Sequence, residues 1–310
     1  EIGVRLVGSE MCIRDRYSVD LLAAINGSPT QGFGYTTLMT NNGKMVNRGV
    51  EITLSGEIIR QKDFSWNASL LYAFNRNKVK HISVQPSLWD SRISMPTSYP
   101  MVGKPLYGIY AYKWAGLNEN GDPQVYDAEN NVTSGPARDY HALVYCGTTV
   151  PIHNASLTNV LRYKGLEFSA MLILDAGHKL RSSNIPSINM SNGRITSTAK
   201  GIVDRWTQPG DVTDVPRLLF SNDTENFNTH RTELYRYSDL FVYDASNIRL
   251  SNISLAYRVP AHWCKKISLS GARLQFNVEN VATFAFDSKA NYDLGGKVKP
   301  NYVWGLYLNF

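Results

Sequence analysis

Apolar and polar residues alternate with a period of two along several separate stretches of the chain. In residues 50–58, VEITLSGEI, the apolar positions are Val50, Ile52, Leu54 and Ile58, with polar residues between them. Successive side chains of a β-strand point to opposite faces, so this period indicates strands. The same pattern recurs at 66–75, 154–177 (two strands), 244–260, 267–284 and 301–310. With a short first strand near 17–24, YSVDLLAA, it predicts about eight strands.

The connections between these strands alternate between short and long. Short turns are expected at 59–63, 163–165 and 259–266, and long polar loops at 25–45, 78–152, 177–243 and 285–300. Short turns at one rim and long loops at the other are typical of an up-and-down transmembrane β-barrel. A soluble β-sandwich has loops of similar length at both ends. We therefore predict an all-β chain of antiparallel up-and-down strands.

The two faces of the predicted strands differ in chemistry. One face is apolar and aromatic, and the other carries Glu, Thr, Ser, Asn, Arg and Gln. The apolar face points inward in a soluble barrel and towards lipid in an outer-membrane barrel, and periodicity alone permits both. The loop asymmetry favours the membrane, as do aromatic residues near strand ends: Trp66, Tyr72, Phe74, Tyr257, Tyr302 and Trp304. The last strand ends on Phe310, which resembles the C-terminal signal of bacterial outer-membrane barrels.

Composition removes several other classes of protein. The net charge is +6, but the Lys and Arg residues are scattered, so we expect no nucleic-acid partner. The three cysteines form no CxxC pair, which argues against a zinc site or a disulfide framework. No run of 18 apolar residues is present, so no transmembrane helix is expected. The six histidines are scattered, no catalytic constellation stands out, and we expect no enzyme.

Several stretches then narrow the family. They are TNNGKMVNRGVEITLSGEIIRQKDFSWNASLLYAFNRNKV (40–79), YPMVGKPLYGIYAYKWAGLNENGDPQVYD (99–127), VDRWTQPGDVTDVPRL (203–218), ASNIRLSNISLAYRVP (245–260) and LQFNVENVATF (274–284). In this order they resemble the SusC/RagA-type TonB-dependent transporters of the outer membrane, a Bacteroidetes-type nutrient-uptake family. The resemblance covers most of residues 17–310.

The resemblance implies a fold and a function. The fold would be a ~22-stranded barrel with a plugged lumen, of which residues 17–310 would form about the last third, without the plug domain. The function would be TonB-dependent import of oligosaccharides or peptides across the outer membrane of a Gram-negative cell. The implied partners are a SusD-like surface lipoprotein and, through the missing N-terminal part, the TonB complex. Two alternatives stay open: a passive porin or autotransporter-type barrel, and a secreted all-β carbohydrate-binding module.

Aromatic residues crowd the two longest predicted loops. They are candidates for contact with a glycan or peptide, because aromatic rings stack on sugar rings and on peptide side chains. The alternative is that they pack the loops against one another. The candidates are Trp89, Tyr107, Tyr110, Tyr112, Trp114, Tyr235 and Tyr237.

Two polar loop segments suggest further roles. In NENGDPQVYDAE (118–129), Asn118, Asn120, Asp122 and Glu129 have the spacing of an EF-hand calcium loop, but Pro123 replaces the required Gly. The segment therefore has two interpretations, a calcium loop or a polar turn at Asn-Gly. In DRWTQPGD (204–211), we expect Arg205 to pair with Asp211 or Asp214 and to hold the shape of the loop.

The first residues do not fit the rest of the chain. LVGSEMCIRDR (6–16), which contains Cys12, resembles the translation of a transposon-type sequencing-library adapter, and its tail back-translates as GAG ATG TGT ATA AGA GAC AG. We therefore interpret residues 1–16 as an adapter-derived artefact and expect them to pack on nothing specific. Residues 17–310 would then be a fragment of a receptor barrel, cut by library chemistry.

Overall fold

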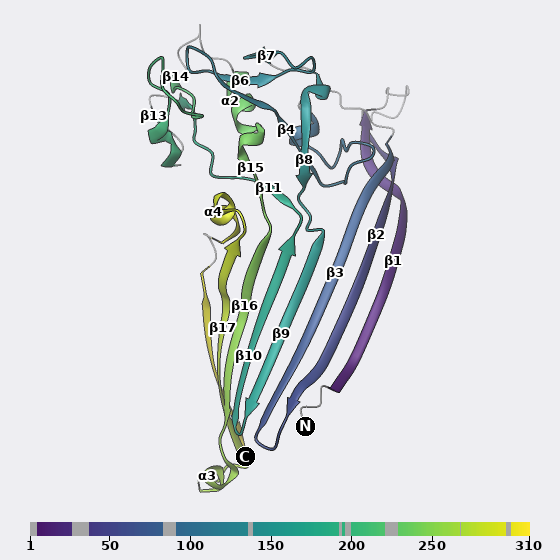
Figure 1. Cartoon of the computed structure of the whole chain (residues 1–310), viewed down its shortest axis with the longest axis vertical. Coiled ribbons are helices and arrows are strands. Elements are labelled where there is room, and N and C mark those ends of the chain that lie inside the picture. The colour runs from purple at the N-terminus through teal and green to yellow at the C-terminus, as the bar shows by residue number, and fades with distance from the viewer. Residues whose placement is uncertain are drawn as a thin grey trace.

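A long curved sheet carries a layer of loops at one end (Figure 1). The computed structural model describes residues 5–26, 37–82, 91–135, 139–191, 194–195, 200–220, 229–266, 268–295 and 299–310. In Figure 1 the long loops gather at the top of the strands, and the short turns lie at the bottom. The predicted alternation of short and long connections is therefore seen as two different rims.

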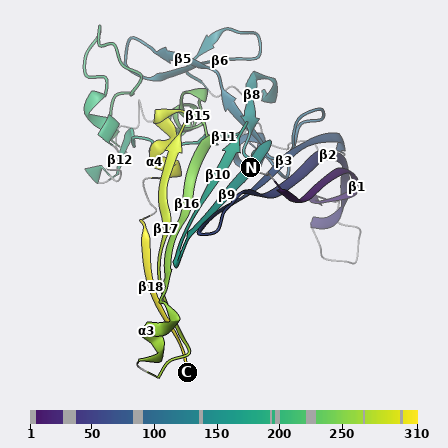
Figure 2. The ribbon, with the colours of Figure 1, turned by 60° about the horizontal axis from the view of Figure 1, so that its bottom comes forward.

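Eight antiparallel strands form the sheet, each paired with its neighbour along the chain. In spatial order they are β1 (Arg5–Asn26), β2 (Thr37–Arg60), β3 (Phe64–Ile82), β9 (His153–Tyr163), β10 (Leu166–Ala176), β16 (Asn247–Arg258), β17 (Gly271–Ala285) and β18 (Asn301–Asn309). The predicted number of strands and their antiparallel order are confirmed. The described strands form an open sheet with β1 and β18 at its edges, and these two strands lie on opposite sides of the sheet (Figure 2).

The first strands are longer than the hydrophobic pattern predicts. β2 has 24 residues and β3 has 19, whereas a tilted strand crosses a membrane in about 9–11 residues. The extra residues of β2, beginning TLMTNNGK, are mostly polar and carry no period-two signal. Main-chain hydrogen bonds between neighbouring strands do not depend on that signal. The predicted loop 25–45 is consequently wrong over residues 37–45, which belong to β2.

Cross-strand pairing unites the apolar positions into one continuous face. One row of directly paired residues runs across six strands: Trp66, Leu161, Phe168, Leu255, Phe276 and Trp304. The ring centroids of Phe276 and Trp304 lie 4.2 Å apart, and Trp304 is 78% exposed. The opposite face carries polar pairs such as Asn154 with Asp175 (2.6 Å). A sheet with one large exposed apolar face needs lipid or another apolar cover.

Residues 5–16 belong to the sheet, although they were expected to pack on nothing specific. They form the first half of β1 and pair with β2, from Arg5 opposite Glu57 to Arg16 opposite Asn47. The expectation that this stretch packs on nothing is wrong for these residues. The edge of a sheet presents unpaired main-chain groups that accept an extended segment whatever its side chains. Because this pairing does not depend on the side chains, it does not test the adapter origin of residues 1–16, which stays a prediction.

Short elements build the loop layer. They form four small sheets, β4–β8, β5–β6–β7, β11–β15 and β13–β12–β14, together with short helices. The bounds are α1 (Ser91–Ser94), β4 (Gly108–Tyr112), β5 (Trp114–Leu117), β6 (Pro123–Tyr126), β7 (Val132–Thr133), η1 (Tyr140–Ala142), β8 (Leu143–Thr148), β11 (Lys179–Arg181), β12 (Asn189–Ser191), β13 (Arg194–Ile195), η2 (Lys200–Asp204), β14 (Leu219–Phe220), α2 (Thr229–Arg236), η3 (Asp239–Phe241), β15 (Val242–Asp244), η4 (Ser288–Ala290) and α4 (Asn291–Leu294). At the opposite rim, α3 (Ala261–Lys265) lies in the turn between β16 and β17 (Figure 1).

Candidate functional site

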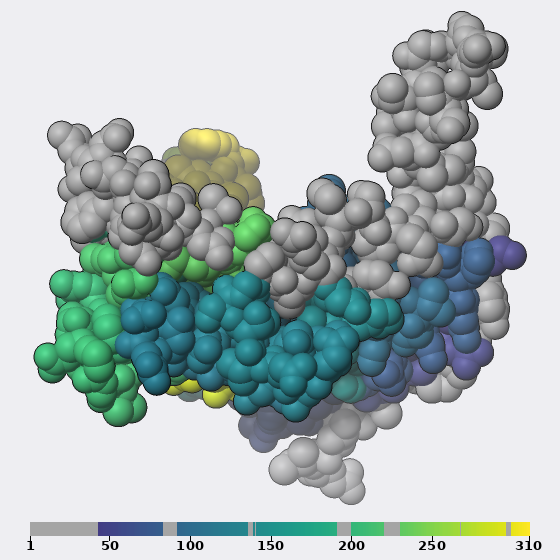
Figure 3. Space-filling view, turned by 90° about the horizontal axis from the view of Figure 1, so that it is seen from above, coloured from purple at the N-terminus to yellow at the C-terminus, as the bar shows by residue number. Residues whose placement is uncertain are grey.

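The loop layer has its own aromatic core. Tyr110 and Tyr112 of β4 are 1% and 0% exposed, and Tyr235 of α2 is 1% exposed. The Tyr235 ring meets Phe241 edge to face, with centroids 4.9 Å apart, and lies 5.8 Å from the Trp114 ring. Burial raises the pKa of Tyr235, so its hydroxyl stays protonated. These rings join the loop before β9 to the loop before β16, and in Figure 3 the surfaces of the two loops meet.

The seven predicted ligand-contacting aromatics therefore fall into two groups. Tyr110, Tyr112 and Tyr235 are buried, and their burial supports the alternative that they pack the loops together. The more accessible residues are Tyr107, which is 45% exposed, and the partly buried Trp114 and Tyr237. Trp89 lies outside the described residues.

A shared carboxylate fastens the two long loops. Asp122, which follows β5, accepts from Nε (3.1 Å) and Nη2 (2.8 Å) of Arg217 and from Nε of Arg231 (3.0 Å). The Arg231 side chain is buried, and its remaining donors reach the carbonyl oxygens of Ile188 (3.1 Å) and Arg217 (2.6 Å). Charge-assisted bonds of this geometry are strong and directional. We call Asp122, Arg217 and Arg231 the loop latch.

Two sequence motifs meet at the loop latch. Asp122 belongs to GDP (121–123), and Arg217 is the next-to-last residue of the VDRWTQPGDVTDVPRL stretch. The Arg217 N–H donates to the Gly121 carbonyl (3.0 Å), and the Trp206 ring packs so closely on Gly121 that a Cβ there would lie 2.4 Å from it. Gly121 also has φ +75°, which favours glycine. The sequence showed both motifs but no signal that they would touch.

The expected pairing of Arg205 is wrong. The Arg205 guanidinium donates to the Ile202 carbonyl oxygen (3.4 Å). Asp211 instead accepts from the hydroxyl of Thr207 (2.7 Å) and from main-chain N–H groups of Thr207 and Gln208, and these bonds lower its pKa. Asp214 accepts from the Trp114 indole (2.9 Å). A short acidic side chain in a tight turn finds main-chain donors nearer than a neighbouring guanidinium.

The calcium interpretation does not fit residues 118–129. The Asp122 carboxylate is held by two guanidinium groups, whose positive charge repels a cation. Asn118 Oδ1 accepts from the main-chain N–H groups of Asn120 and Asp122, both at 2.9 Å. Within the described residues, no group of three or more His, Cys, Asp and Glu side chains is arranged to hold a metal ion. Residues 118–122 form a polar hairpin turn between β5 and β6, and the following Pro123–Tyr126 is β6 itself.

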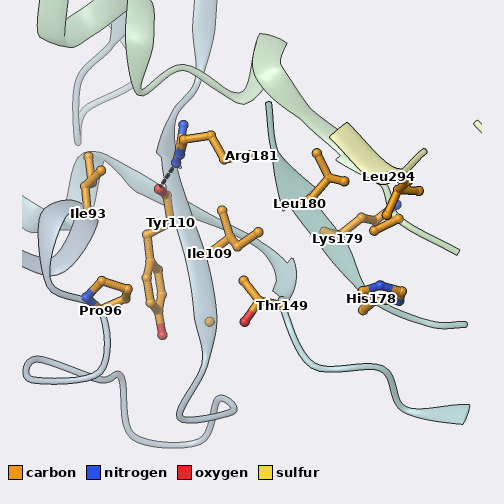
Figure 4. A pocket seen from close by; sticks show the side chains of 12 residues that line it. Ile93, Pro96, Ile109, Tyr110, Thr149, His178, Lys179, Leu180, Arg181 and Leu294 are labelled. Atoms are coloured by element: carbon orange, nitrogen blue, oxygen red, sulfur yellow. Dashed lines mark hydrogen bonds between the residues drawn. The ribbon is translucent and has the colours of Figure 1, made fainter. Parts of the chain in front are cut away.

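A cavity of about 500 Å³ lies where the loop layer meets the sheet. Figure 4 shows Tyr110 and Ile109 of β4 on one side and Lys179 and Leu180 of β11 on the other, with the Arg181 side chain reaching across to the Tyr110 carbonyl oxygen. His178 and Leu294 complete the far wall. No local sequence pattern indicates this cavity, because its walls come from six separate segments.

Comparisons with known proteins show which proteins this chain resembles in sequence. No family model matches the chain. The chain is 24% identical over 294 residues to TonB-dependent receptor P3 of Formosa agariphila, and 25% identical over 257 residues to TonB-dependent receptor P26 of the same organism. These alignments cover 88% and 77% of this chain, but 28% and 24% of the relatives. The chain thus spans about a quarter of the length of these relatives.

Solved structures share the fold. The structure of the RagAB peptide transporter superposes with a TM-score of 0.71 at 22% identity, over 99% of this chain and 34% of the other. The same importer in its closed-closed state gives a TM-score of 0.70. The chain matches a C-terminal portion of RagA/SusC-like TonB-dependent receptors.

The match bears on what the sequence pattern left open. The antiparallel sheet matches part of a TonB-dependent receptor barrel, and in such a barrel the apolar face points to lipid and the polar face to the lumen. The receptors that it matches are outer-membrane proteins of a non-enzymatic transport family. In that arrangement the loops at the long-loop rim would be extracellular, and the turn that contains α3 would be periplasmic. Within the described residues, no helix is both long and apolar enough to cross a membrane.

Proposed function

We propose that the chain forms part of an energised outer-membrane importer that takes up peptides or oligosaccharides. The observation that carries this proposal is the lipid-type sheet face beneath a compact layer of extracellular loops. The similarity to a peptide transporter favours peptides. TonB would supply the energy through an N-terminal plug region, which lies outside the matched residues.

The accessible loop aromatics are the proposed contacts for the substrate. Tyr107 is exposed in the loop before β4, and the Tyr237 ring centroid lies 5.3 Å from the guanidinium carbon of Arg181 and 5.8 Å from that of Arg236. Trp114 bridges the two long loops through Asp214. These rings offer flat apolar surfaces with polar edges, which suit peptide side chains and sugar rings. Trp89 belongs to the same proposal.

A SusD-like lipoprotein is the proposed partner on the extracellular side. The segment around the DRWTQPGD turn supports this, because Val212 is fully exposed (103%) and Val203 is also largely exposed. A partner that covered both side chains would remove apolar surface from water, which favours association.

Uptake by the complete transporter tests the function. Cells that carry it would be given a fluorescent peptide and a fluorescent oligosaccharide, with TonB present or deleted. We expect uptake of at least one substrate with TonB and none without it. Uptake that persists without TonB would identify a passive barrel. A complete protein that stays in solution without detergent would identify a secreted binding module instead.

A further inference from the structure

The cavity under α4 lies beside the lumenal face of the sheet. Gly295, which follows α4, packs on Thr283 of β17, where an added Cβ would lie 3.3 Å from the Thr283 Cβ. Thr283 is paired with Arg249 on the polar face. Asp293 of α4 accepts from the main-chain N–H (3.0 Å) and hydroxyl (2.6 Å) of Ser183. The last loop is therefore folded inward, and its Leu294 side chain closes one wall of the cavity (Figure 4).

The walls are aliphatic. Ile93, Ile109, Leu180 and Leu294 line the cavity, and none of its lining residues carries a carboxylate. A volume of about 500 Å³ is within the range of small-molecule sites. A sugar presents hydroxyl groups on all sides, each of which needs a hydrogen-bond partner when buried. An apolar side chain fits such walls better than a sugar ring.

The polar groups of the cavity carry excess positive charge. Arg181 donates to three carbonyl oxygens, of Tyr110 (2.7 Å), Ser238 (3.3 Å) and Arg236 (3.4 Å). No ion pair within the described residues includes Arg181. Burial lowers its pKa, which shows that its charge is desolvated. A desolvated cation without a carboxylate partner is stabilised by an anionic ligand.

His178 supplies a second group that can bind a ligand. Its side chain is 8% exposed, and its Nδ1 is buried without a hydrogen-bond partner in the described part of the chain. Buried nitrogens without a partner are uncommon, because each costs free energy. Lys179, the next residue, already pairs with Asp244 (3.0 Å). The cavity thus offers one guanidinium without a carboxylate partner and one imidazole nitrogen without a hydrogen-bond partner in the described part of the chain.

We propose that this cavity binds the C-terminal end of a short peptide. The apolar side chain of the last residue lies against Ile109, Leu180 and Leu294, and its carboxylate faces Arg181 with His178 as a hydrogen-bond partner. This inference rests on the proposed import function and narrows its substrate to peptides with a free carboxylate and an apolar last residue.

Titration calorimetry on the complete transporter in detergent tests the site. The probes are the tripeptide Ala-Ala-Leu, the same peptide with a C-terminal amide, and maltotriose. We expect the amide to bind about tenfold more weakly, because it lacks the charge that Arg181 compensates. Leu294→Trp fills the cavity and should weaken Ala-Ala-Leu about tenfold as well. Val132→Trp, which adds the same ring at an exposed position of β7, is the matched control and should bind like the parent.

Each outcome of these measurements either supports or overturns the proposed peptide site. Equal binding of acid and amide, or unchanged binding by Leu294→Trp, overturns the inference, as does a loss of maltotriose binding in Leu294→Trp. Should Leu294→Trp not assemble, a photoreactive tripeptide is cross-linked to the parent protein, and cross-links outside residues 93–110, 149, 178–181, 245 and 294 overturn the inference. If the parent transporter shows TonB-dependent uptake and its Leu294→Trp variant imports normally, the peptide site in the cavity is refuted and the proposed import function stands. If the parent transporter imports neither the peptide nor the oligosaccharide, the proposed import function is refuted.

Discussion

At the scale of single residues, the loop latch is the most sensitive point of the loop layer. Asp122→Asn removes the charge that compensates Arg231, whose side chain is only 3% exposed. An uncompensated buried charge costs about 3–5 kcal/mol. We expect the loop layer to become accessible to trypsin well below the temperature at which the sheet unfolds. Glu129→Gln, at an exposed position of the same loop, is the control and should change nothing. Equal protease resistance of Asp122→Asn and the parent would contradict this role.

Cys146 of β8 provides a second test at this scale. Burial, together with the nearby Asp239, raises the pKa of its thiol from the ordinary 9.0 to about 11. Two pKa units correspond to about a hundredfold less reactive thiolate at neutral pH. In a Cys12→Ser, Cys264→Ser background, we expect iodoacetamide to label the folded protein slowly at pH 7 and to label it rapidly after unfolding. Fast labelling of the folded protein would show that the β8 region is open to solvent.

At the scale of strands and loops, the sequence predicted the sheet better than the site. Alternation located the strands because one face of each is uniformly apolar, as in 50–58 and 66–75. It missed the polar start of β2, which pairs through its main chain with β1. The loop latch joins Asp122 to Arg217 and Arg231, 95 and 109 residues later, and local patterns carry no information on such distant contacts. The loop aromatics were found by composition, but only the structure separates the buried rings from the accessible ones.

The two faces of a single strand should respond differently to charge. Leu274→Arg in β17 places a cation on the lipid face, where it costs up to about 2–4 kcal/mol depending on depth. Gln275→Arg, one residue on, points to the polar face, where Gln275 already contacts Ser254 (3.5 Å) and Asn277 (3.0 Å). We expect Leu274→Arg to lower the amount of assembled protein in the outer membrane, and Gln275→Arg to leave it unchanged. The heat-modifiable band on a gel measures that amount, and the reverse order would mean that the faces are inverted.

At the scale of the whole molecule, the two edges of the sheet determine whether these strands can function alone. β1 and β18 each present a row of main-chain groups without a neighbouring strand in the described sheet. Such groups are not tolerated in lipid, where water cannot satisfy them. We therefore expect residues 17–310 expressed alone to give no heat-modifiable species and no insertion into liposomes, while the complete transporter gives both. Insertion of residues 17–310 as a closed barrel would contradict the fragment interpretation. Resequencing of the genomic locus tests the adapter origin of residues 1–16, since the 16 codons before Tyr17 should be missing there.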